Sequence, residues 1–370
     1  MKKSNVKWVL GAVLAILTVS AGCGKTSTGT AVLKQAPYVI ALSQPGGSVP
    51  GSLYALSPTQ GTVQKLNLSV GLTPNSMLLD GSSLYVVNEG DSTISVITIA
   101  KTAAGISMTN NGYIQLPYNS DPEYLTVTTV NGMDKGYVSL NETNQIAVLN
   151  MDKNTVLEDI SVPSYGAWDP SFQPHPWEIS LVDGKVMLAN NGGDYAAFTY
   201  TSPGMVSVID QSSDRISGSI TTTTGINLQA VAPLTTTGFV VVSVGNYGSV
   251  GGYAELFDNS GVERHAVPLS GGGAAIAISG TGTGYVALDS MVGYDTIDTN
   301  TGQWITTTDL TKQVSGLKGG WLTSIKLAPD GTLWATDWQD NMVFEIDPRT
   351  NTVMKTFTLP EAAQDVVFVY

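Results

Sequence analysis

A run of apolar residues that ends in one small polar residue recurs along this chain. The clearest copy is Leu84-Tyr85-Val86-Val87-Asn88, and the other copies end at Ser43, Asn141, Asn190, Ser243, Asp289 and Asp337. The seven end residues are separated by 45, 53, 49, 53, 46 and 48 positions. A period of this size with four short strands per repeat is typical of a β-propeller, in which each repeat forms one blade. We therefore expect an all-β, seven-bladed β-propeller.

The strands that flank these end residues resemble a known repeat. Leu84 to Asn88 followed by Ile94-Ser95-Val96-Ile97, and Val206-Ser207-Val208-Ile209-Asp210, are similar to the "YVTN" repeat of bacterial and archaeal surface-associated β-propellers. The resemblance covers nearly all of residues 38–370. It implies the propeller fold and an envelope location, and it carries little information about a ligand.

The strand count predicts how the ring closes. Blades two to seven each have four strand-like segments, whereas the first blade, Tyr38 to Leu68, lacks an innermost strand. Asp365 to Tyr370 is an apolar segment left over after blade seven. We expect this C-terminal strand to complete the first blade, which would leave no open sheet edge between the first and last repeats.

The beginning of the chain has the features of an export signal. Lysines in Met1 to Lys7 precede an apolar run, Trp8 to Val19, and then small residues before Cys23. Ser20-Ala21-Gly22-Cys23 resembles a bacterial lipobox, which implies cleavage before Cys23 and a lipid on that residue. Cys23 is the only cysteine, so a disulfide within the chain is excluded. We predict a lipoprotein signal peptide over residues 1–22, a flexible tether over 23–37 and the propeller over 38–370.

Composition narrows the location and the partners. Gly24 stands where an Asp would retain a lipoprotein at an inner membrane, which favours the outer membrane or the cell surface. The net charge of the whole chain is −13, and loss of the three lysines of residues 1–22 would lower it further. Such an acidic balance disfavours nucleic acid as a partner and leaves the lipid anchor as the expected contact with the membrane.

The starts of the innermost strands predict the residues at the mouth of the central channel. The expected set is Asn75, Glu123, Glu178, Gln229, Thr323 and Asp365. Carboxylate and amide oxygens are the ligands that Ca²⁺ prefers, so Glu123, Glu178 and Asp365 are candidate metal ligands. The alternative is that these groups are solvated by channel water.

Blade four has unusually long loops that are rich in aromatic residues. Binding residues tend to lie in long loops on a rigid scaffold, and aromatic rings with polar edges suit a protein partner or the apolar face of a sugar. The predicted binding residues are Trp168, Phe172, Trp177, Tyr195, Phe198 and Tyr200. The alternative is that several of these rings pack the loops onto the blade.

The chain has few residues suited to catalysis. It has two histidines, and the common hydrolase, phosphate-binding and haem-attachment motifs do not occur. Related propellers include lactonases and lyases that use a metal or a histidine, so His175 and Glu178 are the candidate catalytic residues of an enzyme. We expect an envelope-anchored binding or scaffold protein that recognises a protein or glycan through blades three to five. A metal-dependent, lactonase-like hydrolase or lyase and a purely structural envelope protein are the alternatives.

Overall fold

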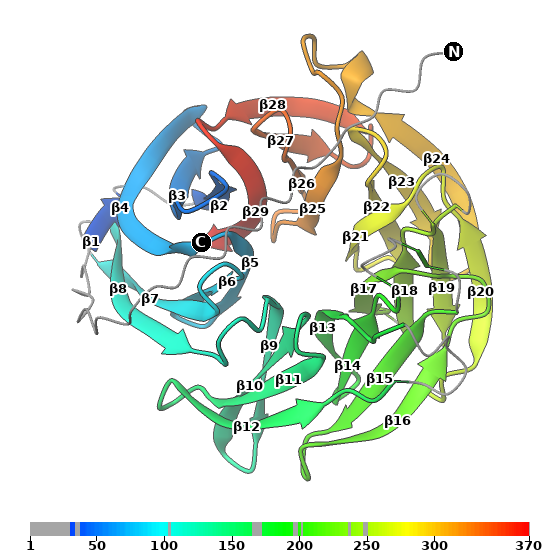
Figure 1. The fold of residues 1–370 in the computed structure, drawn as a ribbon. Coiled ribbons are helices and arrows are strands. Elements are labelled where there is room, and N and C mark those ends of the chain that lie inside the picture. Colours follow the sequence, from blue (N-terminus) through cyan, green and yellow to red (C-terminus); the bar gives the residue numbers. More distant parts are fainter. Residues whose placement is uncertain are drawn as a thin grey trace.

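The computed structural model describes residues 30–33, 38–102, 105–164, 172–194, 199–200, 203–235, 238–246 and 251–369. These residues form seven antiparallel sheets arranged as blades around one central axis (Figure 1). The expected seven-bladed, all-β fold is therefore confirmed. Within the described residues, the single helix is the short 3-10 turn η1 (Leu310–Lys312).

The blades follow the chain in order, with the innermost strand of each blade first. Blade two contains β5 (Pro74–Asp80), β6 (Ser83–Asn88), β7 (Thr93–Thr102) and β8 (Gly105–Gln115). Blade three contains β9 (Pro122–Val130), β10 (Met133–Leu140), β11 (Gln145–Asn150) and β12 (Thr155–Ser161). Blade four contains β13 (Pro176–Val182), β14 (Lys185–Asn190), β15 (Met205–Asp210) and β16 (Arg215–Thr221).

The remaining blades repeat this arrangement. Blade five contains β17 (Leu228–Pro233), β18 (Phe239–Ser243), β19 (Tyr253–Phe257) and β20 (Glu263–Pro268). Blade six contains β21 (Gly273–Ile278), β22 (Thr283–Leu288), β23 (Gly293–Asp298) and β24 (Gln303–Asp309). Blade seven contains β25 (Leu322–Leu327), β26 (Leu333–Asp337), β27 (Met342–Asp347) and β28 (Thr352–Thr358).

The first blade is built from both ends of the chain, as the strand count predicted. Its strands are β29 (Ala362–Val369), β2 (Tyr38–Gln44), β3 (Pro50–Ser57) and β4 (Thr62–Leu72). In Figure 1 the red C-terminal strand lies beside the blue N-terminal strands. Tyr38 pairs with Val369 and Leu42 with Asp365 in an antiparallel register. The pairing closes the ring because it gives blade one the innermost strand that its own repeat lacks.

Blade two has a fifth strand that the sequence did not predict. The segment β1 (Thr30–Leu33) lies within the stretch expected to be a flexible tether, and it pairs with the outer strand β8. Leu33 is 1% exposed and packs into the hydrophobic cluster between blades one and two. The difference from the expected tether follows from this burial, because an apolar side chain in the core stabilises a short added strand.

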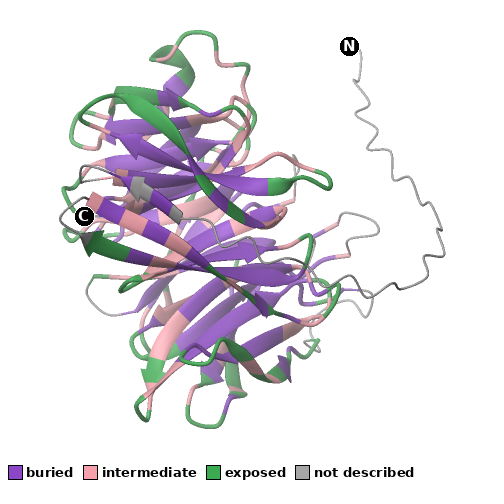
Figure 2. Cartoon of the chain, turned by 90° about the vertical axis from the view of Figure 1, so that its left-hand side faces the viewer, coloured by how far each residue is buried: buried purple, intermediate pink, exposed green. Residues whose placement is uncertain are grey.

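The core lies between the blades. Within the described residues, each pair of neighbouring blades encloses its own hydrophobic cluster, formed by alternate residues of the facing sheets. Figure 2 shows buried residues along the inner strands and exposed residues in the loops and outer strands. Burial is thus distributed around the ring, as in other repeat folds, and does not form one central core.

The predicted N-terminal features lie outside the described residues. These features are the signal peptide over residues 1–22 and the lipid site at Cys23, so both stay predictions. In the part of the chain that the structure describes, no helix has the length and apolar character needed to cross a membrane.

Candidate functional site

Each innermost strand is bulged where it enters its blade. In five of these strands one extra residue interrupts the pairing with the second strand, namely Asn75, Gln229, Ala274, Thr323 and Gln364. In β9 and β13 two residues face one on the partner strand, namely Glu123 and Tyr124, and Trp177 and Glu178. A bulge leaves a residue unpaired in the ladder and re-aims its side chain. The described innermost strands therefore present at least one such position per blade to the same end of the channel.

These bulged positions line a cavity of about 570 Å³ at the channel mouth. The volume is within the usual range for a small-molecule site. The bulge residues that line it are Asn75, Tyr124, Trp177, Gln229, Ala274, Thr323 and Gln364. Residues at or next to the ends of strands complete its wall, namely Gln44, Glu89, Val244, Asp289, Trp321 and Trp338. All seven blades thus contribute to one site.

Two tryptophans of blade seven stack on one side of this cavity. The ring centroids of Trp321 and Trp338 are 5.5 Å apart and their planes differ by 13°. The Trp338 indole nitrogen donates a hydrogen bond of 3.2 Å to the side-chain carbonyl of Gln44 in blade one, which orients the ring. Trp321 is 37% exposed. With Trp177 and Tyr124 across the mouth, four aromatic rings border the cavity.

The three carboxyl groups expected at the mouth lie next to the residues that line it. Glu123 precedes Tyr124, Glu178 follows Trp177 and Asp365 follows Gln364, and none of the three acids borders the cavity. Asn75, Gln229 and Thr323 do line it, as expected. The offset of one residue follows from the bulges, because successive side chains of a strand point to opposite faces.

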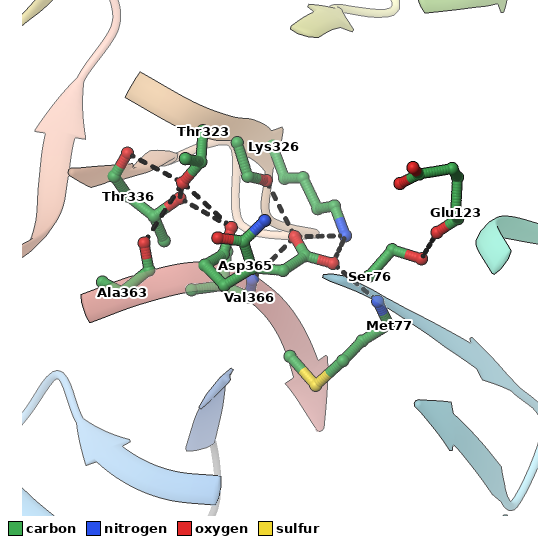
Figure 3. A network of polar contacts seen from close by, with 11 residues as sticks. Ser76, Met77, Glu123, Thr323, Lys326, Thr336, Ala363, Asp365 and Val366 are labelled. Carbon is green, nitrogen blue, oxygen red and sulfur yellow. Dashed lines mark hydrogen bonds and ion pairs between the residues drawn. The ribbon is translucent and has the colours of Figure 1, made fainter. Parts of the chain in front are cut away.

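Two of these carboxyl groups are held by polar contacts within the propeller. Asp365 accepts hydrogen bonds from the Lys326 ammonium at 2.8 Å, the Ser324 hydroxyl at 2.8 Å and the Met77 amide at 2.9 Å (Figure 3). The Glu123 carboxyl accepts a hydrogen bond from the side-chain amide of Asn75. Both groups are buried.

Glu178 differs from these two groups because its side chain is half-buried and is not held by a comparable set of hydrogen bonds. Burial, opposed by Lys326 and reinforced by Asp365, raises the pKa of Glu178 to about 8. Burial also raises the pKa of Glu123 well above its usual range. The pKa of Tyr124 rises well above its usual value through burial, then through Glu178, Asp365 and Glu123. Tyr124 therefore lies among three acids and stays protonated.

The expected metal site is not assembled. Among the described residues, no three Asp, Glu, His or Cys side chains come together in a way that could hold a metal ion. Asp365 and Glu123 instead contact Lys326 and Asn75. Coordination of Ca²⁺ by Glu123, Glu178 and Asp365 stays a prediction.

A second, smaller hollow of about 330 Å³ lies beside the mouth between blades two and three. It shares Glu89 with the channel-mouth cavity and adds Asp91, Asp121 and Glu142. Burial, the charge of Asp121 and a hydrogen bond between the two carboxyl groups raise the pKa of Glu89 to about 8. The pair of Glu89 and Asp121 therefore holds a proton at neutral pH.

The structure describes three of the six predicted aromatic residues of blade four. Trp168, Tyr195 and Phe198 lie outside the described residues. Phe172 is buried against Met205, and Tyr200 is buried with its ring against Gly193. Trp177 alone of the described predicted rings lines the cavity. Phe172 and Tyr200 thus pack against neighbouring residues of blade four, and binding by the predicted set stays a prediction.

His175 lies in the loop before β13 and does not border the cavity. Its side chain is buried, its backbone has a positive φ of 47°, and its imidazole hydrogen-bonds to the backbone of Asn141. Burial lowers its pKa to about 4, so it is neutral at physiological pH. A catalytic role for His175 stays a prediction.

Sequence reasoning missed Trp321 and Trp338, which contribute the stacked pair. Both stand at informative places in the repeat, since Trp321 precedes the entry point Leu322-Thr323 and Trp338 follows the repeat end at Asp337. Aromatic residues at these two repeat positions are therefore the sequence feature that indicates the stacked pair.

Comparisons with known proteins support the fold. No protein-family model and no curated protein sequence matches the chain. The structure is similar to the periplasmic gluconolactonase of Pseudomonas aeruginosa, with a TM-score of 0.66 at 17% identity over 90% of this chain and 99% of that chain. A protein from Lactobacillus plantarum has a TM-score of 0.66 at 12% identity over 93% and 100% of the two chains. A putative 6-phosphogluconolactonase from Bacteroides fragilis has a TM-score of 0.64 at 16% identity over 93% and 99%. Identities this low show a shared propeller fold and nothing finer.

Proposed function

We propose that this protein is a binding module that takes one small organic ligand, such as the end of a glycan, in the channel-mouth cavity. The observation that carries the proposal is the lining of this cavity, which combines four aromatic rings with side-chain amides from several blades. Aromatic faces cover the apolar side of a ligand, and a few placed polar groups fix its orientation.

The polar groups are suited to a ligand with hydroxyl groups. Asn75, Gln229 and Gln364 each combine a carbonyl acceptor with amide donors. Gln364 donates to the Asn75 carbonyl at 2.9 Å, and Gln229 donates to the Asn227 carbonyl at 2.9 Å, so these amides are held in place before a ligand arrives. Pre-organised groups of this kind lower the entropic cost of binding.

Tryptophan fluorescence provides a direct test. We would titrate the full-length protein with glucose, cellobiose and glucosamine and follow the emission of the rings at the mouth. Trp321→Ala removes one ring of the stacked pair and should weaken binding about tenfold or more. Trp304→Ala is the matched control, because Trp304 is 48% exposed on the outer strand β24. Loss of binding in both variants, or in neither, would contradict the placement of the ligand in the channel-mouth cavity.

A second candidate function is hydrolysis of a lactone. The observation in its favour is Glu178, a half-buried carboxyl group with a pKa of about 8 beside Trp177 of the cavity wall. A carboxyl group with a pKa near the working pH is suited to general acid or base chemistry. Proton release from gluconolactone would be followed with the wild type and Glu178→Gln. Equal rates for the two proteins and for buffer would exclude this function for Glu178.

The anchor at Cys23 belongs to the same proposal, since it would place the cavity at the envelope surface. Metabolic labelling with a fatty acid should mark the wild type and leave Cys23→Ser unlabelled. Labelling of both proteins would contradict the lipid site at Cys23.

A further inference from the structure

The charges around the cavity narrow the class of ligand. Two of its lining residues, Glu89 and Asp289, are acidic, and no Lys, Arg or His is among its described lining residues. Lys326 is the cation that influences Glu178 below the mouth, and it is paired with Asp365 at 2.8 Å. A bound anion would therefore meet carboxyl groups without a free positive partner.

The acids and the aromatic rings come from different sides of the ring of blades. Glu89 follows β6 in blade two and Asp289 follows β22 in blade six. Trp177 belongs to blade four, and the stacked pair belongs to blade seven. A cation in a cavity of this kind would have aromatic faces and carboxyl groups around it. Aromatic rings attract organic cations through the negative face of the ring, and Trp is the strongest of them.

We propose that the channel-mouth cavity selects a positively charged organic ligand, an alkylammonium group that the tryptophan faces, Glu89 and Asp289 recognise together. This inference rests on the proposed binding function and adds the charge of the ligand. It separates this site from one built for a sugar acid or a sugar phosphate, because both of those ligands are anions.

Protonation of Glu89 gives the proposal a pH signature. Glu89 shares a hydrogen bond with Asp121, and Asp91 and Glu142 line the adjoining hollow, so its titratable neighbours there are all acidic. Glu123, whose pKa is raised in part by Glu89, lies on the side of blade three. An approaching cation would favour the ionised form of Glu89. Binding should therefore release a proton, and affinity should rise as the pH increases toward about 8.

Choline is a suitable probe because its charge does not change with pH. We would measure its affinity for the full-length protein by calorimetry between pH 6 and 9, in two buffers of different ionisation enthalpy. The expected results are tighter binding at higher pH and a proton released to the buffer. Glu89→Gln should remove the pH dependence, and Asp289→Asn should weaken binding about fivefold. Asp152→Asn, at an exposed site on blade three, is the matched control. It should leave the affinity for choline and its pH dependence unchanged.

Three sugars that share one ring test the charge preference separately from the binding function. Glucosamine should bind more tightly than glucose, and glucuronate should bind most weakly. If glucose binds as tightly as glucosamine and choline does not bind, the charge inference is overturned while the binding function stands. If none of the four compounds binds, both are overturned. Increased salt should weaken choline binding, and an affinity independent of salt would also contradict the inference.

Discussion

Asp365 on the closing strand β29 forms a 2.8 Å ion pair with Lys326 on β25, across the boundary between blades one and seven. The same carboxylate accepts the backbone amide of Met77 in blade two at 2.9 Å. One side chain therefore links three consecutive blades where the two ends of the chain meet. Thr323 adds to this junction by donating to the backbone carbonyl of Ala363 at 3.1 Å (Figure 3).

The first prediction concerns this junction. Asp365→Asn should lower the free energy of unfolding by about 3 kcal/mol, because it leaves the Lys326 ammonium without its charged partner. Ser324→Ala should cost about 1 kcal/mol, since it removes one neutral donor. Urea unfolding of both variants tests this order. An Asp365→Asn cost no larger than that of Ser324→Ala would show that the ion pair does not hold the junction.

The second prediction concerns ring closure. A chain that ends at Ala363 loses the buried residues Val366, Val367 and Val369 and opens the inner edge of blade one. Each buried valine contributes about 1.5 kcal/mol or more, and a domain of ordinary stability has only about 5–15 kcal/mol in total. We expect a clearly lower melting temperature or a loss of the cooperative transition, as seen by circular dichroism.

Leu33→Ala, which weakens the added strand β1, is the matched comparison for this truncation. Blade two retains four strands without β1, so this substitution should lower the free energy of unfolding by about 2 kcal/mol. It should increase hydrogen exchange mainly in the neighbouring strand β8. Equal melting of the full chain and the chain ending at Ala363 would contradict the closure model.

The third prediction concerns the residues that end the recurring apolar runs. Asn88 is fully buried, its amide donates to the Thr93 carbonyl at 3.3 Å, and its carbonyl accepts the Gly71 amide at 3.0 Å. Asn88→Ala leaves these buried groups without a partner and should cost about 2–3 kcal/mol. Asn259→Ala, at an exposed turn, should change stability by less than about 0.5 kcal/mol. Thermal denaturation of the two variants tests this difference. Equal and small shifts in melting temperature would show that the hydrogen bonds of Asn88 do not stabilise the fold.

The fourth prediction concerns pH. The folded protein keeps a proton on Glu178 up to about pH 8, whereas the unfolded chain releases it near the ordinary value of 4.5. The folded state thus binds more protons between these values, so its contribution to stability is present at low pH and is lost as the pH rises from about 4.5 to about 8. Melting temperatures measured across this range should fall less steeply for Glu178→Gln. Asp152→Asn should keep the wild-type slope, and an unchanged slope in Glu178→Gln would contradict the raised pKa.

Much of the fold could be predicted from the repeat. The spacing of residues such as Asn88 and Asp337 set the number of blades, and the surplus segment after blade seven predicted that β29 would pair with β2. The four residues of β1 were not predicted, because four residues are too few to show an alternating pattern.

The residues that line the cavity at the channel mouth differ at three positions from those expected there. The entry residues were identified from their place in the repeat, yet Tyr124, Trp177 and Gln364 line the cavity in place of their acidic neighbours. The aromatic composition of the long blade-four loops predicted a binding site there. The stacked pair Trp321 and Trp338 lies instead in short segments of blade seven.

The sequence by itself therefore determined the number of blades, their order and the closure of the ring, because these follow from the period and from strand pairing along the backbone. The tertiary structure decided which side chains meet at the mouth. A bulge of one residue turns Gln364 toward the cavity and Asp365 toward Lys326. Alternation has a period of two, so a shift of one residue exchanges the two faces of a strand, and only the paired register of the assembled blades reveals that shift.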